Sequence, residues 1–341
     1  MKFNRIAYLL FLGFFATNTT IEGNMAAVQG NICNLDPIFN EATPYPVPRK
    51  VLESWGSGVA FDNATPYTLE EIAAAHAVIN QLYLKKLAEN PPQSAHAVIT
   101  AGAPGAGKTL LMRDALQGSN CFYVDPDDVY LKELPMFQQA LATGDGAPAD
   151  RQAAYTKARP MSNFATQVTL AQLIRDKHSF YFGTTSSGAT TAGFYAFLKQ
   201  NGYKIEVLHV SAPAAVRWAS IQERDKTFIQ TTEQDVREKG LLFTQRINDT
   251  YFKYADTIKF YFRDDAKGPA RLAAVWVRDQ GVGSSLHVLK IIDIDAYKKL
   301  ITLNEALAIE AGAPGFVKSV EAASDCIEAE FFQETAAAAK S

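Results

Sequence analysis

One segment of the sequence constrains the fold more than any other. Residues Gly102–Thr109 read Gly-Ala-Pro-Gly-Ala-Gly-Lys-Thr and fit the pattern G-x-x-x-x-G-K-[ST] in full. An apolar run at 97–100 precedes this segment, and a helical pattern at 109–116 follows it. Because a buried strand, a glycine-rich loop and a helix in this order form a P-loop, the segment predicts a parallel strand that leads into a phosphate-binding loop. A glycine turn with an exposed lysine is the alternative, which the flanking patterns disfavour.

The residue types in this loop match the chemistry of phosphate binding. Its glycines permit close approaches that a Cβ would block, so that backbone N–H groups can point at phosphate oxygens. Lys108 would bring positive charge to the β- and γ-phosphates of ATP, and the Thr109 hydroxyl could ligate Mg²⁺. The predicted nucleotide-binding residues are Gly102, Ala103, Pro104, Gly105, Ala106, Gly107, Lys108 and Thr109, and Thr109 is also the predicted metal ligand.

Strand and helix patterns alternate through the middle of the chain, which is typical of a doubly wound parallel sheet. The expected strands are 121–124, 180–182 and 204–210, and the expected helices are 130–142, 164–177, 191–201 and 214–223. After Asp265 the pattern changes to two strands, two helices and a turn. We expect the strands at 272–278 and 286–292, the turn between them at 279–285, and the helices at 296–303 and 317–328.

An acidic turn, Asp125–Asp128, follows the second expected strand. Ligands of parallel α/β sheets bind at the carboxyl ends of the strands, so these carboxylates should face the phosphate-binding loop. A carboxylate there can orient Mg²⁺ or accept the proton of an attacking hydroxyl. The alternative role is to cap the helix that follows. For Asp128 this alternative and the functional role are equally supported, whereas for Asp127 the functional role is favoured. Because the sequence shows no guanine-reading or water-positioning motif of a switch-type GTPase, the combination indicates a small kinase.

The order of these motifs resembles the zeta-toxin family of P-loop kinases. Besides the loop and the acidic turn, the segments that carry the resemblance are Leu134-Pro135, Phe182-Gly183-Thr184, Asn201-Gly202-Tyr203 before the strand at 204–210, Ala212-Pro213 and Gln222-Glu223-Arg224. The resemblance spans residues 97–265, roughly half of the chain. The ordered succession makes it specific, since the P-loop alone is shared by many folds.

The resemblance implies that the chain transfers the γ-phosphoryl group of ATP to a hydroxyl of UDP-N-acetylglucosamine and so poisons the supply of a cell-wall precursor. Carried over by position, Asp127 would be the general base, Lys108 would hold the phosphates, and Arg224 would stabilise the transferred charge. Thr184 and Asp125 would contact the substrate. An antitoxin protein is a further partner that this resemblance leaves to be tested, and no nucleic acid is expected.

Some arginine roles stay open. The family has a second lid arginine shortly after the first, whereas the matching region here, Phe228–Thr232, contains none. Arg237 or Arg246 could substitute from a neighbouring helix. Arg159 is predicted to bind the sugar or a phosphate, and a surface residue is the alternative.

These patterns divide the chain into a signal-like apolar segment (1–24), an irregular and helical N-terminal extension (25–92), a P-loop kinase core (93–265) and a C-terminal extension (266–341). In the second region, a helix should begin after the N-cap Thr68 and end near Asn90. The predicted fold class is α/β, with a doubly wound parallel sheet of the P-loop NTPase type, a helical N-terminal extension and a small C-terminal α+β extension.

The N-terminus resembles a secretory signal peptide. Lys2 and Arg5 precede an apolar run, Ile6–Phe15, and a polar stretch follows. The run is too short to span a bilayer, which takes about 20 residues. A true start at Met25 and an apolar helix that packs on the body are the alternatives. Because an exported kinase still needs ATP, export would imply action in the cytosol of another cell, whereas a start at Met25 would imply a cytoplasmic protein.

Composition excludes some classes of protein. The net charge of −3 and the pI near 6.0 argue against a nucleic-acid binder, which usually carries a basic patch. Cys33, Cys121 and Cys326 are too few and too scattered for a disulfide framework or a zinc site. The histidines His76, His96, His178, His209 and His287 show no metal-ligand spacing, so we predict no metal other than nucleotide-bound Mg²⁺.

Two other functions remain open at this point. One is a P-loop kinase for another acceptor, such as a nucleic-acid end, an antibiotic or a protein. The other is an exported nucleotide-binding protein that has lost its chemistry, which the incomplete arginine lid would fit.

Overall fold

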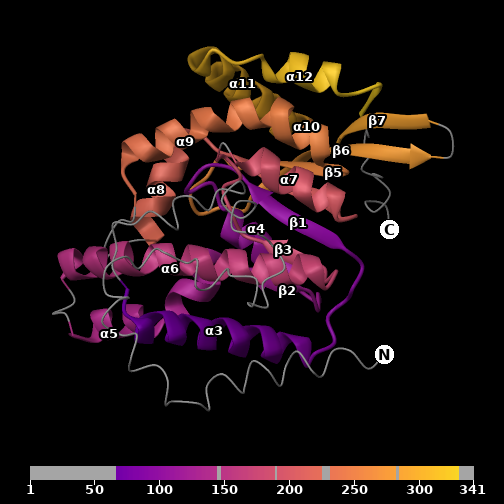
Figure 1. Cartoon of the computed structure of the whole chain (residues 1–341). Coiled ribbons are helices and arrows are strands. Elements are labelled where there is room, and N and C mark those ends of the chain that lie inside the picture. The colour runs from indigo at the N-terminus through magenta and orange to yellow at the C-terminus, as the bar shows by residue number, and fades with distance from the viewer. Residues whose placement is uncertain (1–66, 144–146, 189, 225–230, 282–283, 330–341) are drawn as a thin grey trace, which may run out of the picture.

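An eight-stranded sheet forms the centre of the molecule, in the order β2-β3-β1-β4-β5-β6-β7-β8 (Figure 1). The computed structural model describes residues 67–143, 147–188, 190–224, 231–281 and 284–329. Its strands are β1 (His96–Ala101), β2 (Phe122–Val124), β3 (Phe180–Phe182), β4 (Lys204–Ser211), β5 (Thr257–Phe262), β6 (Arg271–Gly281), β7 (Ser284–Ile291) and β8 (Cys326–Ala329). Strands β1 to β5 pair in parallel, β6 is antiparallel to both of its neighbours, and β8 is parallel to β7. The mostly parallel sheet confirms the predicted P-loop NTPase fold class.

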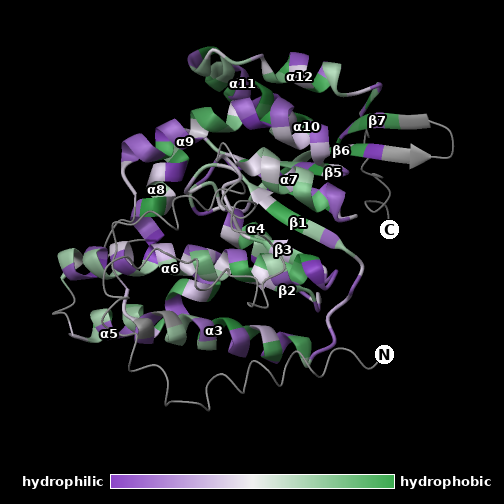
Figure 2. Cartoon of the chain, viewed as in Figure 1, coloured by the Kyte–Doolittle hydropathy of each residue, from purple (hydrophilic) through white to green (hydrophobic). Residues whose placement is uncertain are grey.

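Helices cover the sheet on both faces, as a parallel sheet requires. The α-helices are α3 (Leu69–Leu87), α4 (Lys108–Leu116), α5 (Pro135–Thr143), α6 (Pro148–Arg175), α7 (Thr191–Gln200), α8 (Ala214–Arg224), α9 (Glu233–Arg246), α10 (Phe252–Tyr254), α11 (Ile294–Ala311) and α12 (Phe316–Ala322). Figure 1 shows α3, α5 and α6 together at the β2 side of the molecule and α9, α11 and α12 at the opposite side. The hydropathy colouring of Figure 2 shows β1 as a largely hydrophobic segment between them.

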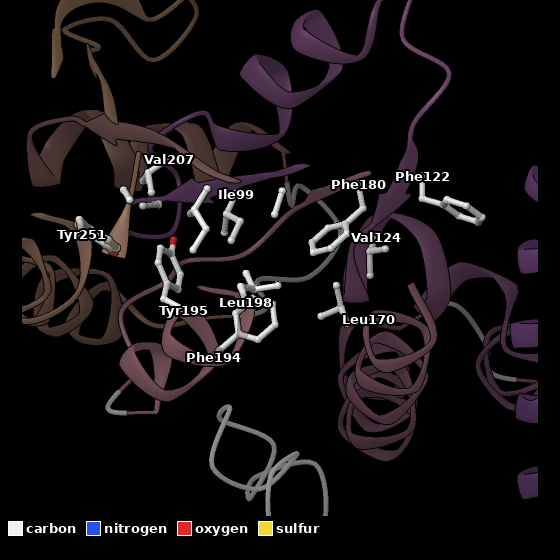
Figure 3. Close-up of a cluster of buried hydrophobic side chains, with 14 of the residues drawn as sticks. Ile99, Phe122, Val124, Leu170, Phe180, Phe194, Tyr195, Leu198, Val207 and Tyr251 are labelled. Atoms are coloured by element: carbon white, nitrogen blue, oxygen red, sulfur yellow. The ribbon is translucent and has the colours of Figure 1, made fainter. Parts of the chain in front are cut away.

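Apolar side chains on alternate positions of the central strands fill the core. Ile99 of β1 and Val207 of β4 are both fully buried and lie beside Tyr195 and Leu198 of α7 (Figure 3). A second, smaller cluster on the other face joins Val210 at the end of β4 to the loop before α4. The strand that leads into the phosphate-binding loop is therefore anchored in the core by Ile99, and the loop itself is held at Ala106 against the end of β4.

The first described helix confirms the prediction from its N-cap. Thr68 accepts a hydrogen bond from the backbone N–H of Glu71, and the Glu71 carboxylate accepts one from the N–H of Thr68, which completes a capping box. Near the other end of α3, the Tyr83 hydroxyl donates to Asp176 at 2.9 Å. This bond ties α3 to the end of α6.

Two predicted helices differ from the structure because of proline. The sequence predicts one helix over 130–142, but a π-helical turn (Pro126–Tyr130, η2), a 3₁₀ turn (Leu131–Glu133, η3) and α5 replace it. Leu134 precedes Pro135 and takes an extended ψ of 118°, because proline disfavours a helical conformation in the residue before it. The helix predicted over 164–177 is wrong at its start, since α6 begins at Pro148 and contains Pro160.

The last third of the chain also departs from prediction. The sequence assigns no element to residues 225–265, where the structure has α9, a π-helical turn (Ile247–Tyr251, η4), α10 and β5. The helix predicted over 317–328 ends at Ala322, because residues 326–329 pair with β7 as strand β8. The turn predicted at 279–285 is shorter, since β6 extends to Gly281 and β7 begins at Ser284.

Several predictions fall on residues outside the described ranges. The signal-like segment, Met25 and Cys33 all precede residue 67, and most of the lid region at 228–232 lies in the gap at 225–230. Cys121 and Cys326 are free thiols. Within the described ranges, the structure contains no helix long and apolar enough to cross a membrane.

The predicted domain boundary at residue 265 falls between two neighbouring strands of one sheet, β5 and β6. Residues beyond it complete the core: Trp276 packs on Phe252 with ring centroids 5.2 Å apart, and Phe316 packs on Phe260 at 5.6 Å. We therefore expect a chain that ends at Asp265 not to fold, because it loses these contacts and leaves β5 as an open apolar edge. Circular dichroism with thermal unfolding tests this, and a soluble fragment that unfolds cooperatively would contradict it.

Candidate functional site

The loop between β1 and α4 adopts a conformation that only glycine accommodates at three positions. Gly102, Gly105 and Gly107 have φ angles of 132°, 78° and 100°. A Cβ at Gly102 would collide with the carbonyl oxygen of Val210, and one at Gly105 would lie 2.8 Å from the carbonyl carbon of Arg217. The backbone of the loop thus rests directly on the end of β4 and on the first turn of α8.

The N-terminus of α4 is open toward this loop. Gly107 is the N-cap and supplies no side chain, so the first N–H groups of the helix lack a side-chain cap. Lys108 begins the helix, and its Nζ donates to the carbonyl of Ala103 at 2.9 Å. Uncapped helix amides beside a lysine are the usual chemistry of a phosphate site.

The charge on Lys108 is disfavoured in the free protein. Burial lowers the pKa of Lys108 to about 7, Arg224, Arg217 and Lys239 lower it further, and the Asp125 carboxylate opposes them. An anion in the loop would reverse this balance, because it would offset the repulsion between these cations.

Two buried arginines support the loop from behind. Arg217 is 2% exposed and donates Nε to the carbonyl of Ala212 at 3.0 Å and Nη1 to the carbonyl of Val236. Arg263, after β5, is 3% exposed and donates Nη1 to the carbonyl of Gly105 at 3.4 Å. Burial lowers the pKa of both, that of Arg217 to about 10. Both guanidinium groups bind backbone carbonyls, so they act as supports of the loop and of α9.

The acidic turn is organised by its first aspartate. Asp125 accepts hydrogen bonds at Oδ1 from the backbone N–H groups of Asp127 and Asp128, both at 2.8 Å. Its Oδ2 lies beside the Tyr123 hydroxyl at 3.3 Å and so close to Gly183 that a Cβ there would collide with it. Burial raises the pKa of Asp125 to about 6. One oxygen of the Asp125 carboxylate, Oδ1, therefore holds the backbone of the turn. The predicted contact of Asp125 with the substrate stays a prediction.

The structure places Asp127 and Arg159 together. Arg159 of α6 donates Nη1 to Oδ1 of Asp127, which is 45% exposed, and within the described residues Oδ2 of Asp127 makes no hydrogen bond. The two side chains are therefore paired with each other, and the predicted role of Arg159 in binding the sugar or a phosphate stays a prediction. A carboxylate that is held at one oxygen and open at the other is suited to accept a proton.

Asp128 has a different role from Asp127. It forms ion pairs with Arg113 of α4 at 3.1 Å and with Lys132 at 2.6 Å. It therefore ties the acidic turn to the helix that follows the phosphate-binding loop.

Thr184, the predicted substrate contact, lies in a segment bonded to β1. The Thr184 N–H donates to Oγ1 of Thr100 at 2.8 Å, and its own Oγ1 accepts from the N–H of Ser186 at 3.3 Å. The next carbonyl, that of Thr185, accepts from the Gly102 N–H at 3.0 Å. The end of β3 is thus fastened to the start of the phosphate-binding loop.

Of the lid arginines considered from the sequence, only Arg224 lies close to the loop, since it acts on the Lys108 charge. Arg237 pairs with Glu310 of α11, and Arg246 pairs with Asp249, so both are engaged elsewhere. Lys239 of α9 also acts on the Lys108 charge, and no salt bridge engages it among the described residues. Lys239 is thus a further cation near Lys108 that the sequence analysis did not predict.

The metal prediction rests on Thr109, which is exposed in the first turn of α4. A hydroxyl there and the Asp125 carboxylate, which acts on the charge of Lys108, are hard oxygen ligands, the type that suits Mg²⁺ when a nucleotide supplies further oxygens. The described part of the chain contains no cluster of three or more His, Cys, Asp or Glu residues that could hold a metal by itself.

Other residues of the site were not singled out in the sequence. Arg217, Arg263 and Asn304 surround the loop from segments 100 or more residues away, and no local pattern marks them. Their only sequence signal is position, since Arg217 follows the end of β4 and Arg263 follows the end of β5, the strand ends where ligands bind.

The zeta toxin family model matches residues 80–250, which is half of the chain. No curated protein sequence matches. The match begins within α3 and ends in η4, so it includes the loop, the acidic turn, α8 and α9.

Some solved structures resemble parts of this chain at low identity. The PezAT chromosomal toxin-antitoxin system of Streptococcus pneumoniae is 14% identical over 58% of this chain and 78% of that chain, with a TM-score of 0.45. The AvrRxo1-ORF1:-ORF2 complex is 14% identical over 85% and 93%, with a TM-score of 0.46. Shikimate kinase from Acinetobacter baumannii is 19% identical over 52% and 87%, with a TM-score of 0.30. Likeness at this level says nothing of substrate or partner.

A matched pair of glycines tests the close approach in the loop. Gly105 and Gly118 have similar φ angles, 78° and 74°, but no atom lies within 4 Å of a Cβ at Gly118. We expect Gly118→Ala to lower the free energy of unfolding by about 1–2 kcal/mol, the cost of a left-handed alanine. Gly105→Ala should cost about 1–3 kcal/mol more, because it also collides with Arg217. Urea unfolding measures both, and equal losses would show that the collision is relieved.

Proposed function

From the premise that the chain belongs to the zeta-toxin family, we propose that it is an ATP-dependent kinase that phosphorylates a hydroxyl of a nucleotide sugar such as UDP-N-acetylglucosamine. The observation that carries the proposal is the Asp127 carboxylate, held by Arg159 on a turn whose first residue, Asp125, acts on the charge of Lys108. A phosphate-binding lysine after β1 and an open carboxylate after β2, two strands of one sheet with β3 between them, are the two parts that phosphoryl transfer to a hydroxyl requires.

In the proposed reaction, the acceptor oxygen attacks the γ-phosphorus of ATP in line with the bond to the β-phosphate. The new O–P bond forms as the bond to the β-phosphate oxygen breaks, and the products are the phosphorylated acceptor and ADP. The hydroxyl proton passes to Oδ2 of Asp127, while Arg159 keeps the carboxylate in place through Oδ1.

Positive charge around the loop would stabilise the charge of the transferred group. Lys108 and Arg224 would act on the phosphates, and Lys239 of α9, whose charge also acts on Lys108, would supply the positive charge of a second lid arginine. Bound Mg²⁺ would offset charge on the β- and γ-phosphates, with the Thr109 hydroxyl as its protein ligand.

The proposed class of acceptor, a nucleotide sugar, is inferred from the family match and from the residues around Asp127. Arg159 is 27% exposed beside it, which leaves a cation within reach of a diphosphate or a sugar hydroxyl. Thr184 and Asp125 complete the proposed acceptor side. An antitoxin protein as partner and export with action in an ATP-containing cytosol belong to the same proposal.

An activity assay tests the assignment of the base. With labelled ATP and a panel of nucleotide sugars, Asp127→Asn should lower kcat by about 10²–10⁴-fold, because it removes the proton acceptor. The KM for ATP should stay near the wild-type value, since Asp127 is not part of the loop. Asp114→Asn is the matched control, an exposed carboxylate of α4, and should leave the rate unchanged.

Three other results of this assay would contradict parts of the proposal. Equal rates for the wild type and Asp127→Asn would rule out Asp127 as the base. Phosphorylation of other hydroxyl compounds but of no nucleotide sugar would exclude the proposed acceptor. Nucleotide binding without turnover on the whole panel would favour a binding protein over a kinase.

The lowered pKa of Lys108 predicts how nucleotide affinity changes with pH. The phosphates bind the protonated lysine, but above about pH 7 the free protein releases this proton and must take it up again on binding. We therefore expect Kd for ATP to rise by up to about tenfold per pH unit between about pH 7 and 9. Isothermal titration across this range measures it.

Lys108→Arg provides the control for that measurement, because arginine stays protonated while the ionisation of ATP itself is the same for both proteins. The variant's affinity should show a flatter pH profile. Parallel profiles for the wild type and the variant would contradict the assignment to Lys108.

A further inference from the structure

A small pocket lies behind the phosphate-binding loop, between the end of β4 and the helices α9 and α11. Gly102 and Ala103 of the loop, His209 and Ser211 of β4, and Asn304 of α11 contribute to its lining. The pocket offers ≈ 20 Å³ to the centres of water molecules. One ordered water needs about 10–15 Å³ and two to four polar partners, so the space is sufficient for one water.

Three buried polar residues form a chain of hydrogen bonds along this pocket. Asn304 donates Nδ2 to the Leu300 carbonyl at 2.8 Å and to Oγ of Ser211 at 3.0 Å. Oγ of Ser211 lies 2.8 Å from Nε2 of His209. Because the Leu300 carbonyl can only accept, the amide atom that faces it is Nδ2, and Oδ1 is left over.

The hydrogen bonds of Ser211 indicate which ring nitrogen of His209 carries the proton. Oγ of Ser211 accepts from Asn304, and among the described residues its hydroxyl proton has no acceptor other than Nε2 of His209, so we assign the proton to that bond and the ring's own proton to Nδ1. Burial, and then the charge of Lys108, lowers the pKa of His209 to about 3, so the ring is neutral. This chain of hydrogen bonds thus ends in one unused donor, Nδ1–H of His209, and one unused acceptor, Oδ1 of Asn304.

Neither of these end atoms has a hydrogen-bond partner in the part of the chain that the structure describes. His209 and Asn304 are each 1% exposed, so bulk water does not reach them. A donor and an acceptor that line the same small pocket can both be satisfied by one bridging water.

Ser211 connects this chain of hydrogen bonds to the phosphate-binding loop. The carbonyl of its neighbour Val210 is the group that Gly102 rests on. The carbonyl of Ser211 accepts from the N–H of Arg263 at 2.9 Å, and the Arg263 side chain donates to the carbonyl of Gly105. A shift at Ser211 would therefore reach both the first and the middle glycine of the loop.

We propose that Asn304 is a positioning residue of the phosphate-binding loop, which acts through Ser211 and through a water shared with His209. Asn304 belongs to α11, beyond the residues 80–250 that match the family, so the C-terminal region takes part in building the phosphate site. The effect on the loop itself follows from the contacts alone. Its consequence for nucleotide affinity rests on the proposed function.

The test compares Asn304→Leu with Asn248→Leu, a substitution at an exposed asparagine, in the full-length protein. Asn248 donates Nδ2 to Oγ of Ser319 at 2.7 Å, which is also an Asn–Ser bond between the core and the C-terminal region, but one that does not involve the residues of the loop. Hydrogen exchange of the free protein should be about tenfold faster for the amides of 102–108 in Asn304→Leu, and unchanged there in Asn248→Leu. The Kd of a non-hydrolysable ATP analogue should rise about tenfold in the first variant only.

The outcomes separate this proposal from the proposed function. Unchanged loop exchange in Asn304→Leu, or equal acceleration in both variants, would overturn the positioning role. If the wild type binds no analogue, the proposed function fails, while the exchange measurement still decides the role of Asn304. Ser211→Ala, which removes the central hydroxyl with little change of volume, gives the same readout should Asn304→Leu not fold.

Discussion

The contact between the phosphate-binding loop and two backbone carbonyls, those of Val210 and Arg217, is the constraint on which the rest of the site depends. Glycine at 102 and 105 lets the loop lie against these groups without a Cβ between them. Because the contacts are made by backbone on both sides, the loop takes its position from the end of β4 and the start of α8. Side chains that surround the site can then be placed relative to a rigid frame.

Charge is distributed unevenly around this frame. Arg224 and Lys239 both repel the charge of Lys108, whereas the acidic turn lies beyond the neighbouring strand. Such a cluster is unfavourable for the free protein and becomes favourable when an anion enters, which is how a site can select a polyphosphate. Arg217 and Arg263 differ from these cations, because their donors are bound to carbonyls and support the loop instead.

The C-terminal region is continuous with the core that carries the site. Strands β6 to β8 extend the sheet from the edge of β5, and Trp276 and Phe316 contribute to its apolar interior. Through Asn304 the same region reaches the end of β4. A part of the chain that lies outside the family match is therefore in contact with the part that defines the family.

The sequence by itself determined the loop at 102–109, the strand before it, the acidic turn and the α/β class, because each of these is encoded by residues that are neighbours in the chain. It failed where distant residues decide the outcome: residues 326–329 become a strand only because β7 offers a parallel edge, and α6 continues through Pro160 because it is packed against α3 and α5. Only the tertiary structure decided that Arg159 meets Asp127, that Arg237 and Arg246 are engaged elsewhere, and that Asn304 lies behind the loop. The physical reason is that side-chain partners across a sheet are chosen by strand order and helix packing, which no local pattern specifies.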